Sequence, residues 1–185
     1  MVDITSLLQR AREHNDSSAL DAIVDALYPD LHRMAEAQLA KNCPITLLDA
    51  TSMVHETYER LRGAARIDAS CRGQFMAYAS QVMRSVIVDF ARKRRAECRG
   101  GGAVHVTLST DLIDGQFSTD EDIERVNDAV QELEGCDERL KRVVEMRYFG
   151  GFGEQEIADA LGVTERTVRR DWERAKLLLR VAIRS

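Results

Sequence analysis

Apolar residues recur along most of this chain at the three- and four-residue spacing of α-helices. In the first half the pattern predicts one or two helices over about 17–40, a helix over about 50–61, and a longer helix that starts near Gly73. Pro29 stands inside the first of these, where it either kinks the helix or begins a new one. In the longer helix the apolar steps alternate between three and one, which is typical of a helix buried along one stripe.

A glycine run at 100–102 interrupts this pattern, and the residues up to about 122 carry turn formers and acids without a helical period. Helical spacing resumes over 122–133, 137–149, 154–161 and 164–183, while strand signals are nearly absent. The sequence therefore predicts an all-α fold of two helical domains. These are residues 1–98 and 123–185, joined by an acidic flexible linker over 99–122.

Charge is distributed unevenly, although the whole chain has a net charge of only −5. Residues 104–138 carry a net charge of −10, so the rest of the chain is basic. Residues 84–99 and 163–185 each carry +4, and both lie in predicted helices or at their ends. Two basic helices separated by an acidic stretch are typical of a nucleic-acid-binding protein.

Several functional classes are excluded or disfavoured by what the chain contains. No apolar run approaches the length of a membrane span, and the first residues lack the apolar core of a secretory signal. The four cysteines form no C-x-x-C pair, which favours a reducing cytoplasm over disulfides or a zinc site. The histidines are isolated, and no phosphate-binding loop is present, so we expect no catalytic residue, no metal and no cofactor.

The last two predicted helices have the layout of a helix-turn-helix. Gly162 permits a tight turn, Thr164 is a good N-cap, and Val168 and Trp172 begin an apolar stripe that we expect to face the core. Arginines cover the opposite face, which suits the major groove of DNA, although a solvated basic helix is the simpler alternative. The candidate DNA contacts on this face are Arg166, Arg169, Arg170 and Glu173, flanked by Arg174 and Lys176.

Taken in order, residues 50–61, residues 75–95 with their basic end, the linker and the helix-turn-helix resemble bacterial RNA polymerase sigma factors. The resemblance is to the extracytoplasmic-function (ECF) group, which keeps only regions 2 and 4. It covers about 17–98 and 123–182. It implies an alternative sigma factor that binds core RNA polymerase and starts transcription at specific promoters.

The resemblance assigns region 2 to residues 1–98. It implies docking on the clamp coiled coil of the polymerase β′ subunit through Asp49, Glu56, Glu59 and Arg60. It also implies that this region opens the −10 element, where a base leaves the stack. The candidate −10 contacts are Arg72, Gln74, Tyr78, Arg84, Arg92, Lys93, Arg94 and Arg95. Phe75 and Tyr78 could stack on bases, although their place in the apolar stripe favours a core position for both.

Region 4 would span residues 123–185, and the resemblance implies that it reads the −35 element through Arg166, Thr167, Arg169 and Arg170 of the helix-turn-helix. The linker of such proteins threads polymerase channels, so the acidic stretch here either mimics nucleic acid or is a plain solvated linker.

One feature departs from the family pattern. Related proteins carry a D-A-E-D motif where this chain reads Asp49-Ala50-Thr51-Ser52. Either Thr51 or Ser52 caps the helix, or these hydroxyls accept a phosphate that replaces the missing charge. The second interpretation adds a serine/threonine kinase as a partner and favours Thr51, and it leaves open whether an anti-sigma protein exists. Two rival functions are a stand-alone helix-turn-helix regulator and an adaptor that does not contact DNA.

Overall fold

The structure is a computed structural model that describes residues 3–14, 16–41, 48–64, 67–98 and 120–184, and every element in these ranges is helical. The all-α prediction is therefore confirmed. The predicted linker lies almost entirely outside the described residues. The elements are α1 (Ile4–His14), α2 (Ser17–Lys41), α3 (Ala50–Gly63), α4 (Arg72–Cys98), α5 (Asp120–Cys136), α6 (Glu138–Val144), the π-helical turn η2 (Glu145–Phe149), α7 (Glu154–Leu161) and α8 (Glu165–Arg184).

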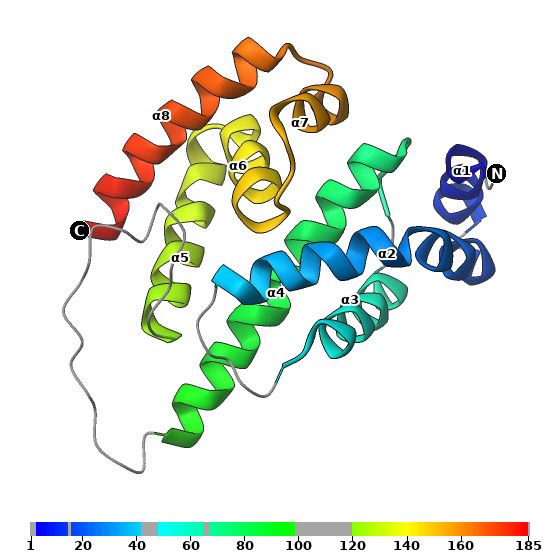
Figure 1. The fold of residues 1–185 in the computed structure, drawn as a ribbon, viewed down its shortest axis with the longest axis horizontal. Helices are drawn as coiled ribbons and strands as arrows, with labels where there is room; N and C mark the ends of the chain where they lie inside the picture. Colours follow the sequence, from blue (N-terminus) through cyan, green and yellow to red (C-terminus); the bar gives the residue numbers. More distant parts are fainter. Residues whose placement is uncertain (1–2, 15, 42–47, 65–66, 99–119, 185) are drawn as a thin grey trace.

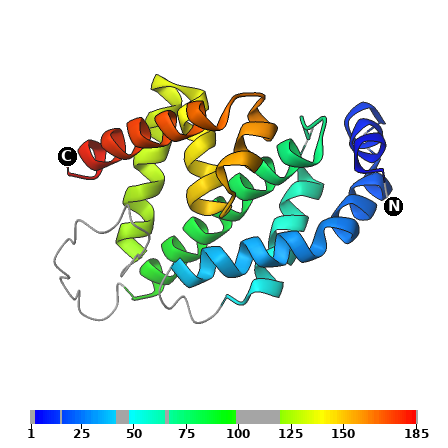
Figure 2. The same cartoon turned by 45° about the horizontal axis from the view of Figure 1, so that its top comes forward.

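Helices α1 to α4, here called the N-terminal half, pack on one another in chain order (Figure 1). Helix α2 continues through Pro29 as one element, and Figure 2 shows it bent along its length, as a proline inside a helix leads one to expect. Helix α1 was not predicted. Its N-terminus is held by the Asp3 carboxylate, which accepts the backbone N–H groups of Thr5 and Ser6.

The apolar stripe of α4 forms the centre of this half. Phe75, Ala79, Met83 and Val86 are fully buried, and Ile87 is 1% exposed. The prediction that Phe75 belongs to the core is confirmed, and in this structure its ring has no surface on which a base could stack.

Helices α5 to α8 form the C-terminal half, in which α6 and α5 both pack against α8 and α7 crosses its start. The range 137–149, predicted as one helix, divides into α6 and the five-residue π turn η2. The expected break at 150–153 is present, and Gly151 adopts a φ of 68° that favours glycine.

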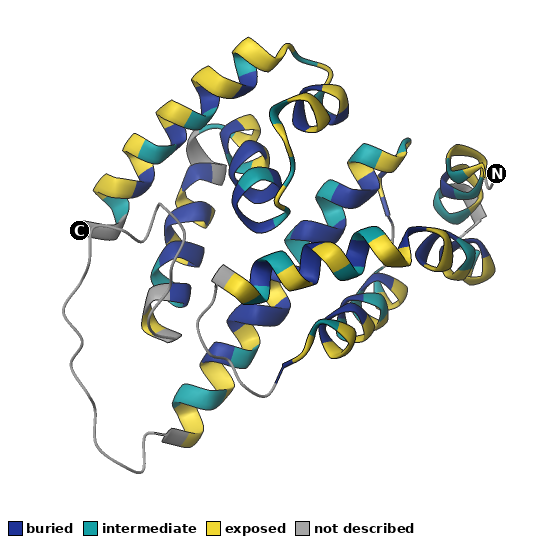
Figure 3. Cartoon of the chain, in the orientation of Figure 1, coloured by how far each residue is buried: buried dark blue, intermediate teal, exposed yellow. Residues whose placement is uncertain are grey.

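The two halves are in contact. Helix α4 packs on α2 and α3 with one side and on α5, η2 and α7 with another, and Figures 1 and 2 show it between them. One hydrophobic cluster runs from Leu8 in α1 to Leu179 in α8. Figure 3 shows the buried positions of both halves turned towards each other, with exposed positions on the outer side of α8. The sequence did not predict this contact.

Candidate nucleic-acid interface

The helix-turn-helix is built as its sequence predicts. Helix α7 ends at Gly162, whose φ of 66° allows the turn, and the N–H of Val163 donates to the carbonyl of Ala158. The Thr164 hydroxyl accepts the N–H of Thr167 at 3.3 Å, which makes Thr164 the N-cap of α8. These local interactions fix the direction in which α8 leaves the turn.

The inner face of α8 anchors it to the rest of the C-terminal half. Val168 and Ala175 are fully buried, as predicted. Between them, the Asp171 carboxylate is 2% exposed and accepts the Nε–H of Arg139 at 2.7 Å. The hydrogen bond to Asp171, and then the charge attraction between the two groups, raise the pKa of the Arg139 guanidinium. This pair joins α6 to α8.

Trp172, which the sequence predicts to lie in the core, is only half-buried. Its ring packs against the apolar core and lies under two cations, with the Arg147 guanidinium carbon 5.2 Å and the Lys176 ammonium 5.8 Å from the ring centroid. Lys176 also lies 2.8 Å from the Glu173 carboxylate. Lys176 therefore contacts Trp172 and Glu173 at the edge of α8 and does not point outward.

The outer face of the first turns of α8 is exposed and strongly basic. Six residues line one shallow surface depression there, all of them among the predicted contacts except Thr164. They are Thr164, Arg166, Thr167, Arg169, Arg170 and Glu173. Arginine side chains on one exposed helix face can bind guanine edges or phosphates, so the geometry suits a DNA major groove.

Arg169 is held in place by an acidic partner from α7. Its Nη2 lies 2.7 Å and its Nε 3.2 Å from one Glu154 carboxylate oxygen, and Arg147 contacts the other oxygen at 3.1 Å. Hydrogen bonds from Arg169 and then Arg147 lower the pKa of Glu154, and the same contact raises that of Arg169. The side chain is thus oriented before any ligand arrives. Arg174, further along, lies 3.7 Å from Asp137.

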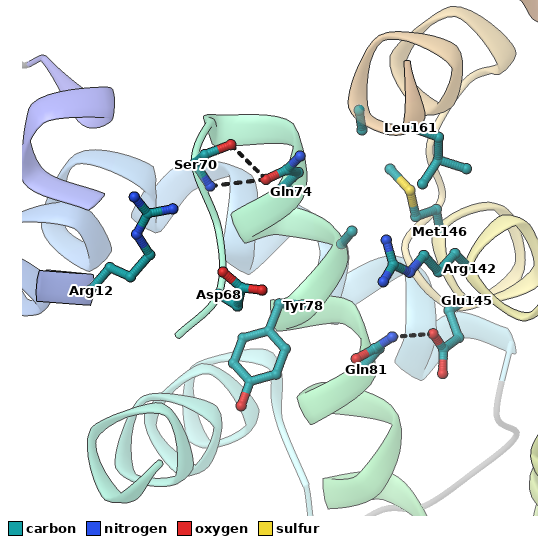
Figure 4. Close-up of a pocket in the computed structure, with 12 residues that line it drawn as sticks. Arg12, Asp68, Ser70, Gln74, Tyr78, Gln81, Arg142, Glu145, Met146 and Leu161 are labelled. Atoms are coloured by element: carbon teal, nitrogen blue, oxygen red, sulfur yellow. Dashed lines mark hydrogen bonds between the residues drawn. The ribbon is translucent and has the colours of Figure 1, made fainter. Parts of the chain in front are cut away.

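The predicted −10 residues at the start of α4 surround a polar pocket between the two halves (Figure 4). Gln74 accepts the N–H and hydroxyl of Ser70 at 2.9 Å, and Tyr78 is half-buried in the pocket wall. Arg142, Met146 and Leu161 of the C-terminal half form the opposite wall. Arg72 lies just outside, with its guanidinium 2.6 Å from Asp30.

Arg84, predicted to face DNA, does not face solvent here. Its side chain is 9% exposed, and Nη2 lies 2.9 Å from the Glu145 carboxylate of η2. Its Nη1 donates to the Asn127 side-chain oxygen of α5. In this arrangement Arg84 joins the halves, and contact with DNA requires that they separate.

The basic run at the end of α4 is turned partly towards α5. Arg95 lies 3.2 Å from Glu124, and Arg92 lies 4.0 Å from Asp128, while Lys93 is exposed. Because α4 rises about 1.5 Å per residue, this run lies roughly 30–35 Å from Arg72 along the helix. The candidate −10 contacts therefore form a long track rather than one compact site.

At the start of α3, neither Thr51 nor Ser52 is the cap, so that interpretation is wrong. Asp49 is the N-cap: its carboxylate accepts the Ser52 N–H at 2.8 Å and the Ser52 hydroxyl at 3.1 Å. These two hydrogen bonds lower the pKa of Asp49. Thr51 is exposed at the second helical position, where a negative group would be favoured by the helix dipole.

The other predicted polymerase contacts lie on α3 as well. Glu59 is exposed, and Glu56 is half-exposed and lies 3.3 Å from Arg60. Arg60 also lies 2.9 Å from Asp89 of α4, and donates to the Ser85 hydroxyl at 2.9 Å. Arg60 therefore ties α3 to α4, in addition to any role at a partner surface.

A comparison with known families finds a match over the full length of the chain. The family described as "ECF sigma factor" matches residues 1–185. The chain belongs to the ECF sigma factor family. No curated protein matches this sigma factor. Members of the family are transcription initiation factors rather than enzymes.

Two negative findings apply to the described part of this sigma factor. No helix there is both long enough and apolar enough to cross a membrane. In the same residues, no cluster of His, Cys, Asp or Glu side chains has the arrangement of a metal site.

Some structurally important residues of the sigma factor escaped sequence reasoning. Helix α1 does have a sequence signal, because Ile4, Leu7 and Leu8 recur at helical spacing after Asp3, a good N-cap residue. Asp171 could have been found as an acid on the apolar side of an arginine-rich helix. Glu145 and Asn127 gave no signal, because their partner Arg84 is far away in the sequence.

We expect Asp171→Asn to lower the stability of the sigma factor by about 1–3 kcal/mol, because Arg139 loses a charged hydrogen bond to a buried acceptor. Chemical denaturation monitored by Trp172 fluorescence measures the change. Glu173→Gln is the matched control, since Glu173 is exposed on the same helix and pairs with Lys176 at the surface. Equal unfolding midpoints for the two variants would contradict the anchoring role.

Proposed function

We propose that this ECF sigma factor binds core RNA polymerase and directs it to a specific class of promoters. One observation carries the proposal. In a chain that matches the family from end to end, the outer face of α8 presents a group of exposed arginines directly after a helix-turn-helix turn. That face is suited to reading base edges in a major groove.

The proposal divides the chain into two functional domains. Residues 123–185 act as region 4 and read the −35 element through the first turns of α8. Residues 1–98 act as region 2, with α4 contacting the −10 element and α3 docking on the β′ clamp coiled coil. The exposed carboxylates of Asp49 and Glu59 support the docking role, because acidic groups are complementary to a basic polymerase surface.

We further propose that a serine/threonine kinase controls docking by modifying Thr51. The Ser52 hydroxyl is engaged with Asp49, whereas Thr51 is exposed, and this difference favours Thr51 as the acceptor. A phosphate there would add about −1.5 to −2 of charge at the start of the docking helix. It would replace the carboxylates that the D-A-T-S sequence lacks. The site of action is the cytoplasm, where the polymerase and such a kinase meet.

Transcription with purified components tests the main proposal. The protein, unmodified or phosphorylated, is added to core polymerase with fragmented genomic DNA from its source, and transcript start sites are mapped. New start sites that share −10 and −35 elements support a sigma factor. Specific duplex binding without polymerase-dependent transcripts would instead support a stand-alone helix-turn-helix regulator.

If Arg169 or Arg170 reads a base edge, we expect its replacement by alanine to weaken binding to the matched promoter by about 1–3 kcal/mol and to relax specificity at one position. Competition between the matched promoter and single-base variants measures both effects. Arg180→Ala is the control, because Arg180 lies on the same helix but beyond the depression of the first turns. A loss that is uniform across sequences would indicate a phosphate contact instead.

We expect phosphorylation at Thr51 to raise the affinity for core polymerase by at least about tenfold, through charge-assisted hydrogen bonds to the clamp. Thr51→Ala should stay weak after kinase treatment, whereas Ser52→Ala should still respond. Binding is measured with labelled core polymerase, and promoter output is measured in parallel. Full activity of the unmodified protein, or an active Thr51→Ala in cells, would refute the switch.

A further inference from the structure

The strongest unexplained feature of the molecule is a buried polar cluster between its two halves. On α4, Gln81 and Arg84 face Glu145 of η2 and Asn127 of α5. The Glu145 carboxylate accepts a hydrogen bond from the Gln81 side-chain amide and another, of 2.9 Å, from the Arg84 guanidinium. The Ser80 hydroxyl adds a bond of 2.8 Å to the Glu145 backbone carbonyl. We call Arg84, Glu145 and Asn127 the interdomain latch.

The latch lies within a close contact of the two halves. A Cβ atom placed on Gly73 of α4 would lie only 2.9 Å from the Cβ of Ala160 of α7. The two helices therefore lie so close that any residue larger than glycine at position 73 would require them to shift. Between Gly73 and the latch, the polar pocket of Figure 4 has walls from both halves. The contact therefore extends from the first turn of α4 to its middle.

This contact covers the middle of the side of α4 that is proposed to meet the −10 element. Arg84 is buried against the C-terminal half, and Tyr78 is half-buried in the pocket that this half roofs. Gln74, which lines the same pocket, and Arg72, which borders a second pocket with Phe152 and α7 on its other wall, are exposed. DNA strands and the C-terminal half cannot both occupy the surface around Tyr78 and Arg84. The outer face of α8, in contrast, is exposed in the same arrangement.

The latch holds the two halves in a defined arrangement but contributes little net free energy to keep them together. Buried ion pairs gain little net stability, because the desolvation of both charges offsets their attraction. Burial raises the pKa of Glu145, with desolvation the largest cause, in spite of the opposing effect of Arg84. In addition, the buried Nε of Arg84 has no hydrogen-bond partner among the described residues.

We propose that the free protein is held closed by this latch, and that the C-terminal half must leave α4 before the −10 element can be engaged, with Arg84 exchanging Glu145 for DNA phosphate. This inference rests on the proposed function for its last step. It adds a conformational control that acts at α4, separate from docking at α3. The recognition face of α8 stays accessible in the closed state, so −35 contact can precede opening.

Substitutions on the C-terminal half test the latch and leave Arg84 in place. We expect Glu145→Gln to raise the open fraction by at least about tenfold, because it removes the carboxylate that lies 2.9 Å from the buried Arg84 guanidinium. X-ray scattering of the free protein should then give a radius of gyration above the value of about 16 Å expected for a compact chain of this length. Glu138→Gln, at an exposed pair on α6, is the control. Equal scattering of both variants and wild type would overturn the latch.

A reversible crosslink tests whether opening is required. The four native cysteines at 43, 71, 98 and 136 are replaced by serine. Gly73→Cys is then combined with Ala160→Cys, a pair that needs a shift of about 1 Å to reach disulfide geometry. The oxidised protein should lose at least about nine-tenths of its transcription from a promoter identified by the start-site mapping, and reduction should restore it. Gly73→Cys alone, oxidised in the same way, is the control.

The outcomes separate the two proposals. Failure of the cysteine pair to crosslink, or full transcription by the oxidised protein, would overturn the closed state or the need to open it. If the reduced protein and the wild type both fail to support transcription, the proposed function fails instead. The crosslink and the scattering comparison then still decide whether the free protein is held closed through Glu145.

Discussion

The packing of α4 on two sides is the constraint on which the rest of the molecule depends. This 27-residue helix buries Phe75, Met83 and Ile87 in the N-terminal half, and it accepts α5, η2 and α7 on another side. The second contact is mixed. The hydrophobic cluster continues from α4 into α5 and η2, and a close glycine–alanine contact at the start of α4 and a polar cluster at its middle complete it.

The arginines that suit DNA already have carboxylate neighbours within the protein. Arg169 contacts Glu154, Arg174 is near Asp137, and Arg95 is near Glu124. Most of these pairs are exposed, so each contributes little to stability in salt. Their larger effect is to fix the rotamers of long side chains, which lowers the entropy lost when a nucleic acid is bound.

Sequence reasoning predicted the local structure well, because its signals were local. Helical spacing predicted the helices from residue 17 onward, Gly162 predicted the turn, and Thr164 predicted the cap of α8. The N-cap of α3 was misassigned, because aspartate, threonine and serine are all good caps and only geometry shows that Asp49 is used. Each of these features depends on residues a few positions apart.

The contact between the halves could not be predicted in the same way. Arg84 was a candidate DNA contact because the family resemblance assigns its helix to the −10 element, and its partners Asn127 and Glu145 are more than forty residues away. A buried ion pair has no periodic signature, since either residue alone resembles a surface position. The sequence also gave no reason to place the C-terminal half on α4 rather than elsewhere, so the site on α4 appeared open.

The π turn η2 has a consequence for the phase of the helix that contains it. A π turn holds more residues than an α turn, so the residues after it are rotated by a large part of the usual 100° step relative to an unbroken α-helix. Helix α6 packs against α5 and α8, while η2 packs against α4, α2 and α7. Glu145 opens η2 with ordinary right-handed helical dihedrals, so the π turn changes the directions of the residues that follow it, up to Phe149. One continuous stretch of backbone thus presents one face to its own half and another face to the other half.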